Sequence, residues 1–203
     1  LNKKQQALNA FKNASEMDFD KAIQEDASLN YAKLSYEIGN SYQSTPDVLT
    51  AFMKKYPNNA NQSEIERLLI DSYISSRNYR EALILLEKNK SPENKLAYQK
   101  VTFYRGLELY TDSNYQEALT LFEKSLDIQK DTKFTARATF WKGETEYVLN
   151  DFKNAVLSYK QFMNLAGAET TPEFKNSNYN LAYSYFKQKE YDQAGNYFQS
   201  YIN

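Results

Sequence analysis

The side chains that could do chemistry in this sequence are carboxylates, hydroxyls and lysines, because its 203 residues include no histidine and no cysteine. That composition removes the commonest general base, the commonest metal ligand, every disulfide and every thiolate metal site. Carboxylate pairs remain as candidates. On a helix, residues two apart point to different sides, whereas residues four apart share a face that is usually solvated. The pairs are Glu64 with Glu66, Glu144 with Glu146, and Glu108 with Asp112.

The sequence therefore predicts a protein that is not an enzyme and that uses no cofactor and no metal. Its five glycines are isolated, so no glycine-rich loop could bind a phosphate. The 25 basic and 26 acidic residues give a net charge of −1, and no block of like charges indicates nucleic-acid binding. No apolar run approaches the roughly 18 residues of a membrane span. We expect no direct membrane insertion of this segment.

One short phrase occurs four times along the chain. "NYREAL" at 78–83 and "NYQEAL" at 114–119 nearly coincide, and "DFKNAV" at 151–156 and "EYDQAG" at 190–195 are looser copies. In each copy an alanine follows an aromatic residue by three positions. These alanines, at positions 82, 118, 155 and 194, are 36, 37 and 39 residues apart. A nearly constant period in this range is typical of a solenoid of stacked repeats.

Between these phrases the apolar residues recur at helical spacing, as at Leu119 and Phe122. Pro46, Pro92 and Pro172 each follow a serine or threonine, which is the pattern of an N-cap before a proline at the start of a helix. The fold class is therefore predicted to be all-α. We expect helices at about 3–16, 20–44, 46–56, 62–76, 79–89, 92–111, 115–129, 132–149, 152–166, 172–188 and 191–202.

Each repeated phrase is expected to open the second helix, B, of a helical hairpin. Its alanine would let helix B approach the first helix, A, closely. One hairpin cannot bury both of its faces, so the unit is repeated and stacked. The aromatic residue of the phrase is expected to fill the hairpin turn; in the four copies it is Tyr79, Tyr115, Phe152 and Tyr191.

This pattern resembles the tetratricopeptide repeat. The resemblance rests on a small residue in helix A, an aromatic near the end of helix A, an alanine in helix B and an aromatic four residues later. Residues 36–59 look like a shortened copy, and residues 7–20 look like a lone helix B. The small residues of helix A are Gly106, Gly143 and Ala182, and the aromatic near the end of helix A is Tyr185. The alanines of helix B are Ala82, Ala118, Ala155 and Ala194, and the aromatics four residues later are Phe122, Tyr159 and Phe198.

The resemblance implies a right-handed α-solenoid of stacked antiparallel helix hairpins. The whole of 1–203 would be a single array, cut from a longer protein, with units at about 1–19, 20–60, 61–94, 95–131, 132–170 and 171–203. Ile70, Leu109 and Glu146 depart from the family pattern, which affects packing angles rather than architecture. The chain is also similar to long repeat proteins of the bacterial cell envelope.

In the family, four positions of each helix A face the concave surface that binds partners. Two of the equivalent residues, Tyr36 and Phe103, stand where a lysine is expected in family members that grip a C-terminal carboxylate, so that binding mode is disfavoured. The predicted partner-binding residues are Tyr36, Asn40, Arg67, Asp71, Lys100, Phe103, Leu107, Tyr110, Arg137, Phe140, Glu144, Tyr147, Tyr179, Tyr183 and Phe186. Several of these rings could instead be packing residues.

The function that the resemblance implies is a scaffold that binds a peptide or a partner protein on its concave face. Aromatic rings with a polar tip suit such contacts. Two alternatives stay open: a structural spacer or self-association element of an envelope assembly, and the sensory input module of a larger signalling protein. A periplasmic or envelope-associated location is favoured over the cytoplasm. The oligomeric state is left open.

Overall fold

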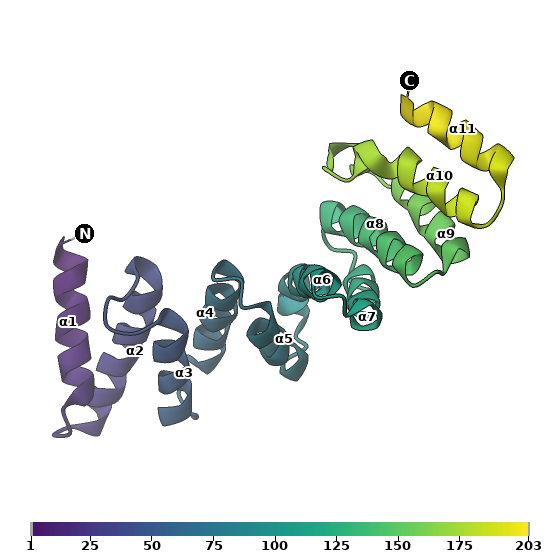
Figure 1. The fold of residues 1–203 in the computed structure, drawn as a ribbon. Helices are drawn as coiled ribbons and strands as arrows, with labels where there is room; N and C mark the ends of the chain where they lie inside the picture. The colour runs from purple at the N-terminus through teal and green to yellow at the C-terminus, as the bar shows by residue number, and fades with distance from the viewer. Residues whose placement is uncertain (1, 203) are drawn as a thin grey trace. The chain divides into compact units, whose positions relative to one another are not determined.

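The computed structural model describes residues 2–202, which form eleven α-helices and three short 3₁₀-helices without a β-strand. The prediction of an all-α fold is confirmed. The helices follow one another as hairpins (Figure 1). The α-helices are α1 (Asn2–Glu16), α2 (Lys21–Ile38), α3 (Thr45–Lys55), α4 (Gln62–Ser75), α5 (Tyr79–Lys88), α6 (Lys95–Thr111), α7 (Tyr115–Leu126), α8 (Thr132–Val148), α9 (Phe152–Met163), α10 (Ser177–Lys187) and α11 (Tyr191–Ile202), and the 3₁₀-helices are η1 (Pro92–Asn94), η2 (Ala168–Thr170) and η3 (Phe174–Asn176).

The chain is divided into two compact units, Leu1–Leu85 (unit 1) and Leu86–Asn203 (unit 2). In unit 1, α2 packs against both α1 and α3, and α4 packs against α3 and α2. In unit 2, each helix from α6 to α11 packs against the next, and α6 also contacts α8. Contacts between neighbours along the chain, with a core running beneath them, are the arrangement of an α-solenoid.

The four hairpin turns that precede the repeated phrases share one backbone conformation. The N–H three residues past the end of each first helix donates to a carbonyl five residues earlier, as from Asn78 to Tyr73 at 2.8 Å and from Asn114 to Leu109 at 2.8 Å. This is the Schellman motif, which ends a helix on a left-handed residue. The left-handed residues are Arg77 (φ 61°), Ser113 (φ 62°), Asn150 (φ 64°) and Lys189 (φ 64°).

The repeated alanines lie in the core, as the repeat pattern predicted. Their exposed fractions are 0% for Ala82, Ala118 and Ala155 and 2% for Ala194. In unit 2 the aromatic of the phrase packs against an aromatic near the end of the preceding helix. The ring centroids are 5.4 Å apart for Tyr110 and Tyr115, 5.3 Å for Tyr147 and Phe152, and 5.6 Å for Phe186 and Tyr191.

The small residue of helix A has a clear packing role in two hairpins of unit 2. A Cβ atom added to Gly106 would lie 2.8 Å from Cε1 of Phe122, and one added to Gly143 would lie 3.0 Å from Cε1 of Tyr159. Phe122 and Tyr159 are 0% and 1% exposed. The two glycines therefore let buried aromatic rings of helix B lie directly on the backbone of helix A.

The predicted helix over 20–44 is wrong at its C-terminal end. Helix α2 ends at Ile38, because Gly39 adopts a φ of 78°. Asn40 then holds the loop: its side-chain oxygen accepts hydrogen bonds from the backbone N–H groups of Tyr42 (2.8 Å) and Gln43 (3.4 Å). These side-chain bonds replace the helical bonds that the longer helix would have made.

The three prolines differ in how well they mark helix starts. Pro46 lies in the first turn of α3, as predicted, but the N-cap is Ser44 rather than Thr45: the Ser44 hydroxyl accepts a hydrogen bond from the Asp47 N–H at 3.3 Å. Pro92 begins η1 just before α6. The start predicted at Pro172 is wrong, because α10 begins only at Ser177 after a loop that contains η3.

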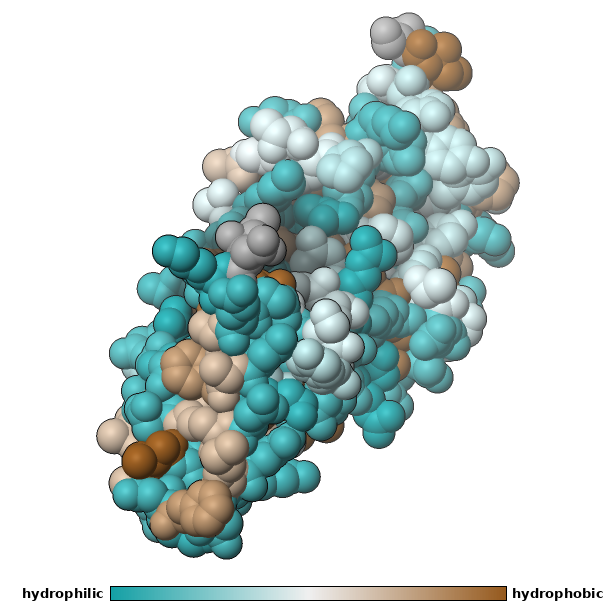
Figure 2. All heavy atoms as spheres, turned by 90° about the vertical axis from the view of Figure 1, so that its left-hand side faces the viewer, coloured by the Kyte–Doolittle hydropathy of each residue, from teal (hydrophilic) through white to brown (hydrophobic). Residues whose placement is uncertain are grey.

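Exposed apolar side chains gather where α1 meets α2. Figure 2 looks at the molecule from the α1 side and shows a brown and tan strip of hydrophobic residues on that face. The large apolar residues near this turn are Met17, Phe19 and Ile23, with exposed fractions of 54%, 96% and 63%. In contrast, Leu8 of the same helix α1 is fully buried in the core of unit 1.

Candidate functional site

An exposed aromatic surface lies on one side of α10 in unit 2, next to α8. We call Tyr147, Tyr179, Tyr183 and Phe186 the aromatic face. Tyr179, Tyr183 and Phe186 are 41%, 36% and 48% exposed. The rings of Tyr179 and Tyr183 are 4.7 Å apart, and those of Tyr183 and Phe186 are 6.4 Å apart. These contacts form a row of rings along the helix.

The local sequence explains why these rings share a face. On α10 they are spaced four and three residues apart, which places them on one stripe of the helix. The opposite stripe, including Leu181 and Tyr185, is buried. Helix α11 supports the exposed stripe from behind, because the Phe198 ring lies 5.1 Å from that of Tyr183 and 6.2 Å from that of Tyr179.

A cavity of about 270 Å³ opens beside the aromatic face, and it is lined by residues of three helices. Its central polar group is the carboxylate of Glu144, which is half-buried. The Tyr159 hydroxyl donates to Glu144 Oε1 at 2.6 Å, and the side-chain amide of Asn180 donates to the same oxygen. The lining residues are Glu144, Tyr147, Tyr159, Tyr179, Asn180 and Tyr183.

Burial sets the electrostatics of this cavity. Burial raises the pKa of the Glu144 carboxyl, and the hydrogen bonds from Tyr159 and Asn180 oppose that rise only in part. Burial and the Glu144 charge also raise the pKa of Tyr159, and the same causes, with Tyr115, raise the pKa of Tyr110 to about 12. The pKa values of Tyr147 and Tyr179 are raised as well, so the hydroxyls of Tyr147, Tyr159 and Tyr179 are protonated near neutral pH.

Four of the predicted partner-binding residues thus meet at one cavity: Glu144, Tyr147, Tyr179 and Tyr183. Phe186 extends the same row of rings. Tyr110 is half-buried and packs edge-on against Trp141 at 5.2 Å. The sequence prediction did not include Tyr159 or Asn180.

Two predicted aromatic residues are core residues rather than surface residues. Phe103 is 0% exposed and packs between Phe122 and Phe134 at 6.1 Å and 5.4 Å. Phe140 is 5% exposed and packs on Phe162 at 5.2 Å. Neither ring could contact a partner in this structure, so we exclude both from the candidate site.

Two further predicted residues of unit 2, Arg137 and Lys100, are already engaged. Arg137 donates to the buried Glu173 carboxylate at 2.8 Å, and its guanidinium carbon lies 4.8 Å from the centre of the Phe103 ring. Lys100 lies 5.8 Å from the Phe134 ring centre. A third predicted residue, Leu107, is half-buried on α6. Glu173 itself lies in the loop after α9, where the helical repeat pattern does not reach.

The predicted residues of unit 1 are more scattered. Tyr36 is 38% exposed on α2, and on α4 Arg67 is exposed and Asp71 half-buried. Asn40 lies in the loop after α2, where its amide donates to the Tyr31 hydroxyl at 2.8 Å. The prediction that Asn40 belongs to a helical binding stripe is therefore wrong, because the residue holds a loop together.

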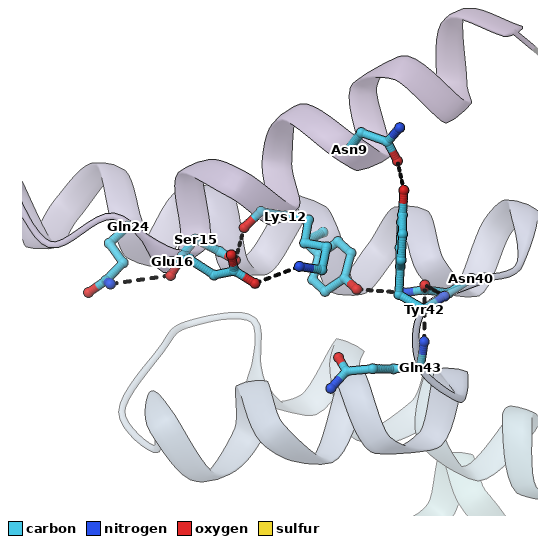
Figure 3. Close-up of polar contacts among 9 residues, drawn as sticks. Asn9, Lys12, Ser15, Glu16, Gln24, Asn40, Tyr42 and Gln43 are labelled. Carbon is cyan, nitrogen blue, oxygen red and sulfur yellow. Dashed lines mark hydrogen bonds and ion pairs between the residues drawn. The ribbon is translucent and has the colours of Figure 1, made fainter.

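A second cavity, of about 460 Å³, lies in unit 1 among α1, α2 and α3. Figure 3 shows its polar rim: the Tyr42 hydroxyl donates to the Asn9 side chain at 3.1 Å, and Lys12 pairs with Glu16 at 2.6 Å. The Lys12 ammonium also lies 5.5 Å from the Tyr42 ring centre. The charges of Lys12 and Glu16 are thus already paired with each other, and the third charged lining residue, Lys55, lies 5.2 Å from the Tyr56 ring centre.

A third cavity, of about 280 Å³, lies in unit 2 away from the aromatic face. It contains none of the predicted residues, and its lining includes Leu86, Tyr98 and Lys124. Lys124 forms a 2.6 Å ion pair with Glu87. The cavity beside the aromatic face is therefore the candidate site that agrees best with the sequence prediction.

The described residues hold no cluster of three or more acidic side chains that could bind a metal ion. Within 2–202, no helix is both long enough and apolar enough to cross a membrane. The aromatic face and the cavity beside it together offer aromatic rings, hydroxyls, the Asn180 amide and the Glu144 carboxylate. These are groups for binding.

Comparison with known proteins identifies the repeat. The tetratricopeptide repeat family matches residues 103–164 and 177–203. No curated protein sequence matches the chain. One crystal structure of MamA is 15% identical with a TM-score of 0.52 over 92% of this chain and 94% of that one. Another is 14% identical with a TM-score of 0.53 over 98% and 91%.

The crystal structure of BtubC from P. vanneervenii is also similar, with 12% identity and a TM-score of 0.52 over 99% of this chain and 87% of that one. At these identities the likeness concerns the fold alone. It agrees with the repeated hairpin turns, the buried alanines and the glycines beneath aromatic rings described above. Residues 103–164 and 177–203 of the chain are therefore identified as tetratricopeptide repeats.

Proposed function

We propose that this protein is a scaffold whose aromatic face binds an extended segment of a partner protein. Tetratricopeptide repeats mediate protein–protein interactions and are generally not catalytic, so the partners of this chain are proteins. The observation that supports the aromatic face is its exposure: three rings in a row stay at least 36% exposed, although the opposite stripe of α10 is buried.

The physical reason is that exposed aromatic rings gain free energy when a partner covers them. Tyrosine offers a large apolar area with few rotatable bonds and a hydroxyl that can bond a peptide group. The row formed by Tyr179, Tyr183 and Phe186 is backed by Phe198, so the rings are held in place before binding. Binding to such a preorganised surface costs less conformational entropy.

A peptide library displayed on phage and selected against the wild-type chain would supply ligands for the test. The affinity of each selected peptide is then measured for the double variant Tyr179→Ser with Tyr183→Ser. We expect binding at least about tenfold weaker, because aromatic residues at the centre of an interface contribute about 1–2 kcal/mol or more each. Circular dichroism verifies that the variant is folded.

The matched control is Leu157→Ser on α9, which removes a large apolar side chain that is 59% exposed outside the aromatic face. Its affinity should stay within about twofold of the wild type. Equal losses in both variants, or no loss in the double variant, would contradict the proposal. The two alternative functions, a structural spacer and a sensory input module, stay predictions. The envelope location also stays a prediction.

A further inference from the structure

The Glu144 carboxylate differs from the other glutamates of unit 2 that are withdrawn from solvent. Glu108 pairs with Arg105 at 2.9 Å, Glu173 pairs with Arg137 at 2.8 Å, and Glu146 pairs with Lys142. Among the described residues, no lysine or arginine forms an ion pair with Glu144. Only burial and two neutral hydrogen bonds act on its pKa.

The hydrogen bonds of Glu144 leave one side of the carboxylate open to the cavity. Both donors, from Tyr159 and Asn180, reach Oε1. Within residues 2–202, no side-chain or backbone donor contacts Oε2. A partner that covers the cavity would take water away from this oxygen, and a carboxylate oxygen desolvated in this way is satisfied best by a charged donor.

The walls of the cavity suit a cation as well. Tyr147, Tyr179 and Tyr183 line it together with Glu144. Aromatic rings attract ammonium and guanidinium groups through the negative electrostatic potential of their faces. A carboxylate beside tyrosine rings therefore combines the two interactions that hold an organic cation out of water.

We infer that the cavity beside the aromatic face binds the cationic side chain, lysine or arginine, of the polypeptide that the aromatic face holds. This inference rests on the proposed function and names the side chain that its partner must present. An anionic side chain would be repelled by Glu144. A neutral side chain would leave Oε2 desolvated and unbonded.

A metal ion fits the cavity less well than an organic cation does. Glu144 is the one carboxylate among the lining residues, and the described chain brings no group of three possible ligands together. Small hard cations are held by several oxygen ligands with formal charge. The tyrosines here supply aromatic rings instead.

The test is an NMR titration of the wild-type chain, followed at the tyrosine ring protons, with Nα-acetyl-lysine methylamide and Nα-acetyl-arginine methylamide. The neutral isostere Nα-acetyl-norleucine methylamide is titrated in parallel. We expect saturable shifts at Tyr147, Tyr179 and Tyr183 with one or both cationic amides. With the neutral amide, the same rings should show shifts at least about fivefold smaller at equal concentration.

The variant Glu144→Gln keeps the size and the Oε1 acceptor of the side chain while removing its charge. It should weaken binding of the cationic amide at least tenfold. Glu123→Gln, on the exposed side of α7, removes the same charge elsewhere and should change binding less than twofold. If Glu144→Gln fails to fold, the comparison of cationic and neutral amides on the wild type decides alone.

Equal shifts with the cationic and neutral amides, no saturable shift with either cation, or unchanged binding in a folded Glu144→Gln chain would overturn the inference. This outcome is distinct from failure of the proposed function. Selected peptides whose binding needs Tyr179 and Tyr183 but is equally strong to Glu144→Gln and to the wild type would support binding at the aromatic face and contradict the cation site. Peptides whose affinity is unchanged by substitution of Tyr179 and Tyr183 would contradict the proposed function, and the titration with amides would still test the cation site.

Discussion

The Tyr159 hydroxyl donates a 2.6 Å hydrogen bond to Glu144, from α9 to α8. The same ring lies over Gly143, the residue next to Glu144, where an added Cβ would come within 3.0 Å of it. The small residue that defines the repeat thus lets the ring approach and brings its hydroxyl to the carboxylate. A packing feature of the repeat and the chemistry of the candidate site are connected through one side chain.

The glycine-on-ring contact should be sensitive to a single methyl group. In Gly106→Ala, the new Cβ would lie 2.8 Å from the buried Phe122 ring, so we expect a loss of about 1–3 kcal/mol in the free energy of unfolding. Urea denaturation measures it. Gly195→Ala is the matched control, because its Cβ would meet no atom within 4 Å on exposed α11, and it should stabilise by about 0.5–1 kcal/mol. A neutral or stabilising Gly106→Ala would contradict this account of the packing.

The left-handed turn residues predict a stabilising substitution. Lys189 has a φ of 64° and is exposed at the turn between α10 and α11. Because glycine adopts this conformation without a steric penalty, Lys189→Gly should raise the free energy of unfolding by about 0.5–1 kcal/mol. The reverse is expected for Gln161→Gly at an exposed position of α9, which should lower the free energy of unfolding by a similar amount. Thermal unfolding of the two variants gives the comparison, and a destabilised Lys189→Gly would show that the turn does not adopt the left-handed form.

Gln99 should be essential for the connection between α7 and α8. Its side chain is fully buried, and it accepts from the N–H groups of Lys130 (3.1 Å) and Asp131 (2.9 Å) while donating to the Asp131 carbonyl (3.2 Å) and Thr135 hydroxyl (3.1 Å). Gln99→Leu leaves these buried groups without a partner, which should cost about 2–4 kcal/mol.

The control for Gln99 is Gln116→Leu on the exposed side of α7, which should stay within about 0.5 kcal/mol of the wild type. Equilibrium unfolding in urea measures both variants. Similar stabilities for Gln99→Leu and Gln116→Leu would mean that the buried hydrogen bonds do not hold this loop.

The raised pKa of Glu144 predicts a pH-dependent stability. The folded chain holds the Glu144 proton more tightly than the unfolded chain, so this residue destabilises the fold above its raised pKa, and the penalty is lost as pH falls toward the ordinary glutamate value of 4.5. The stability of Glu144→Gln relative to the wild type should therefore be greatest near neutral pH and shrink with acidification. Urea unfolding of both chains across this range measures the difference.

The groups that face Glu144 do not disturb this test. The pKa values of Tyr147 on α8, Tyr159 on α9 and Tyr179 on α10 are all raised, so these hydroxyls stay protonated throughout the range. Tyr110 of α6, whose pKa is raised to about 12, behaves in the same way. A stability difference that stays constant with pH would contradict a raised Glu144 pKa.

The sequence predicted the helical hairpins well because their signals are local. Alanine and aromatic spacing determine which residues are buried, and the burial of Ala82 and Ala118 follows from it. The predicted C-terminal end of α2 was wrong because Gly39 and Asn40 stop that helix. The predicted start of α10 was wrong because Pro172 lies in a loop before the helix. Such loop geometry depends on side-chain hydrogen bonds that spacing does not show.

The candidate site was only partly predictable. Equivalent positions in successive helices predicted Glu144, Tyr147, Tyr179 and Tyr183 together, yet the same positions in α6 and α8 gave the buried Phe103 and Phe140. A repeat position specifies a side of the helix but not how deeply neighbouring helices cover it. Tyr159 and Asn180 were missed because their bonds to Glu144 join three different helices.

The most direct test of the central claim is to map where a selected peptide contacts the chain, by intermolecular NMR contacts to the tyrosine rings. The account predicts contacts to Tyr179 and Tyr183, with a lysine or arginine of the peptide nearest Tyr147 and Asn180. Contacts confined to α7, α9 or unit 1, with the rings of the aromatic face unaffected, would contradict it.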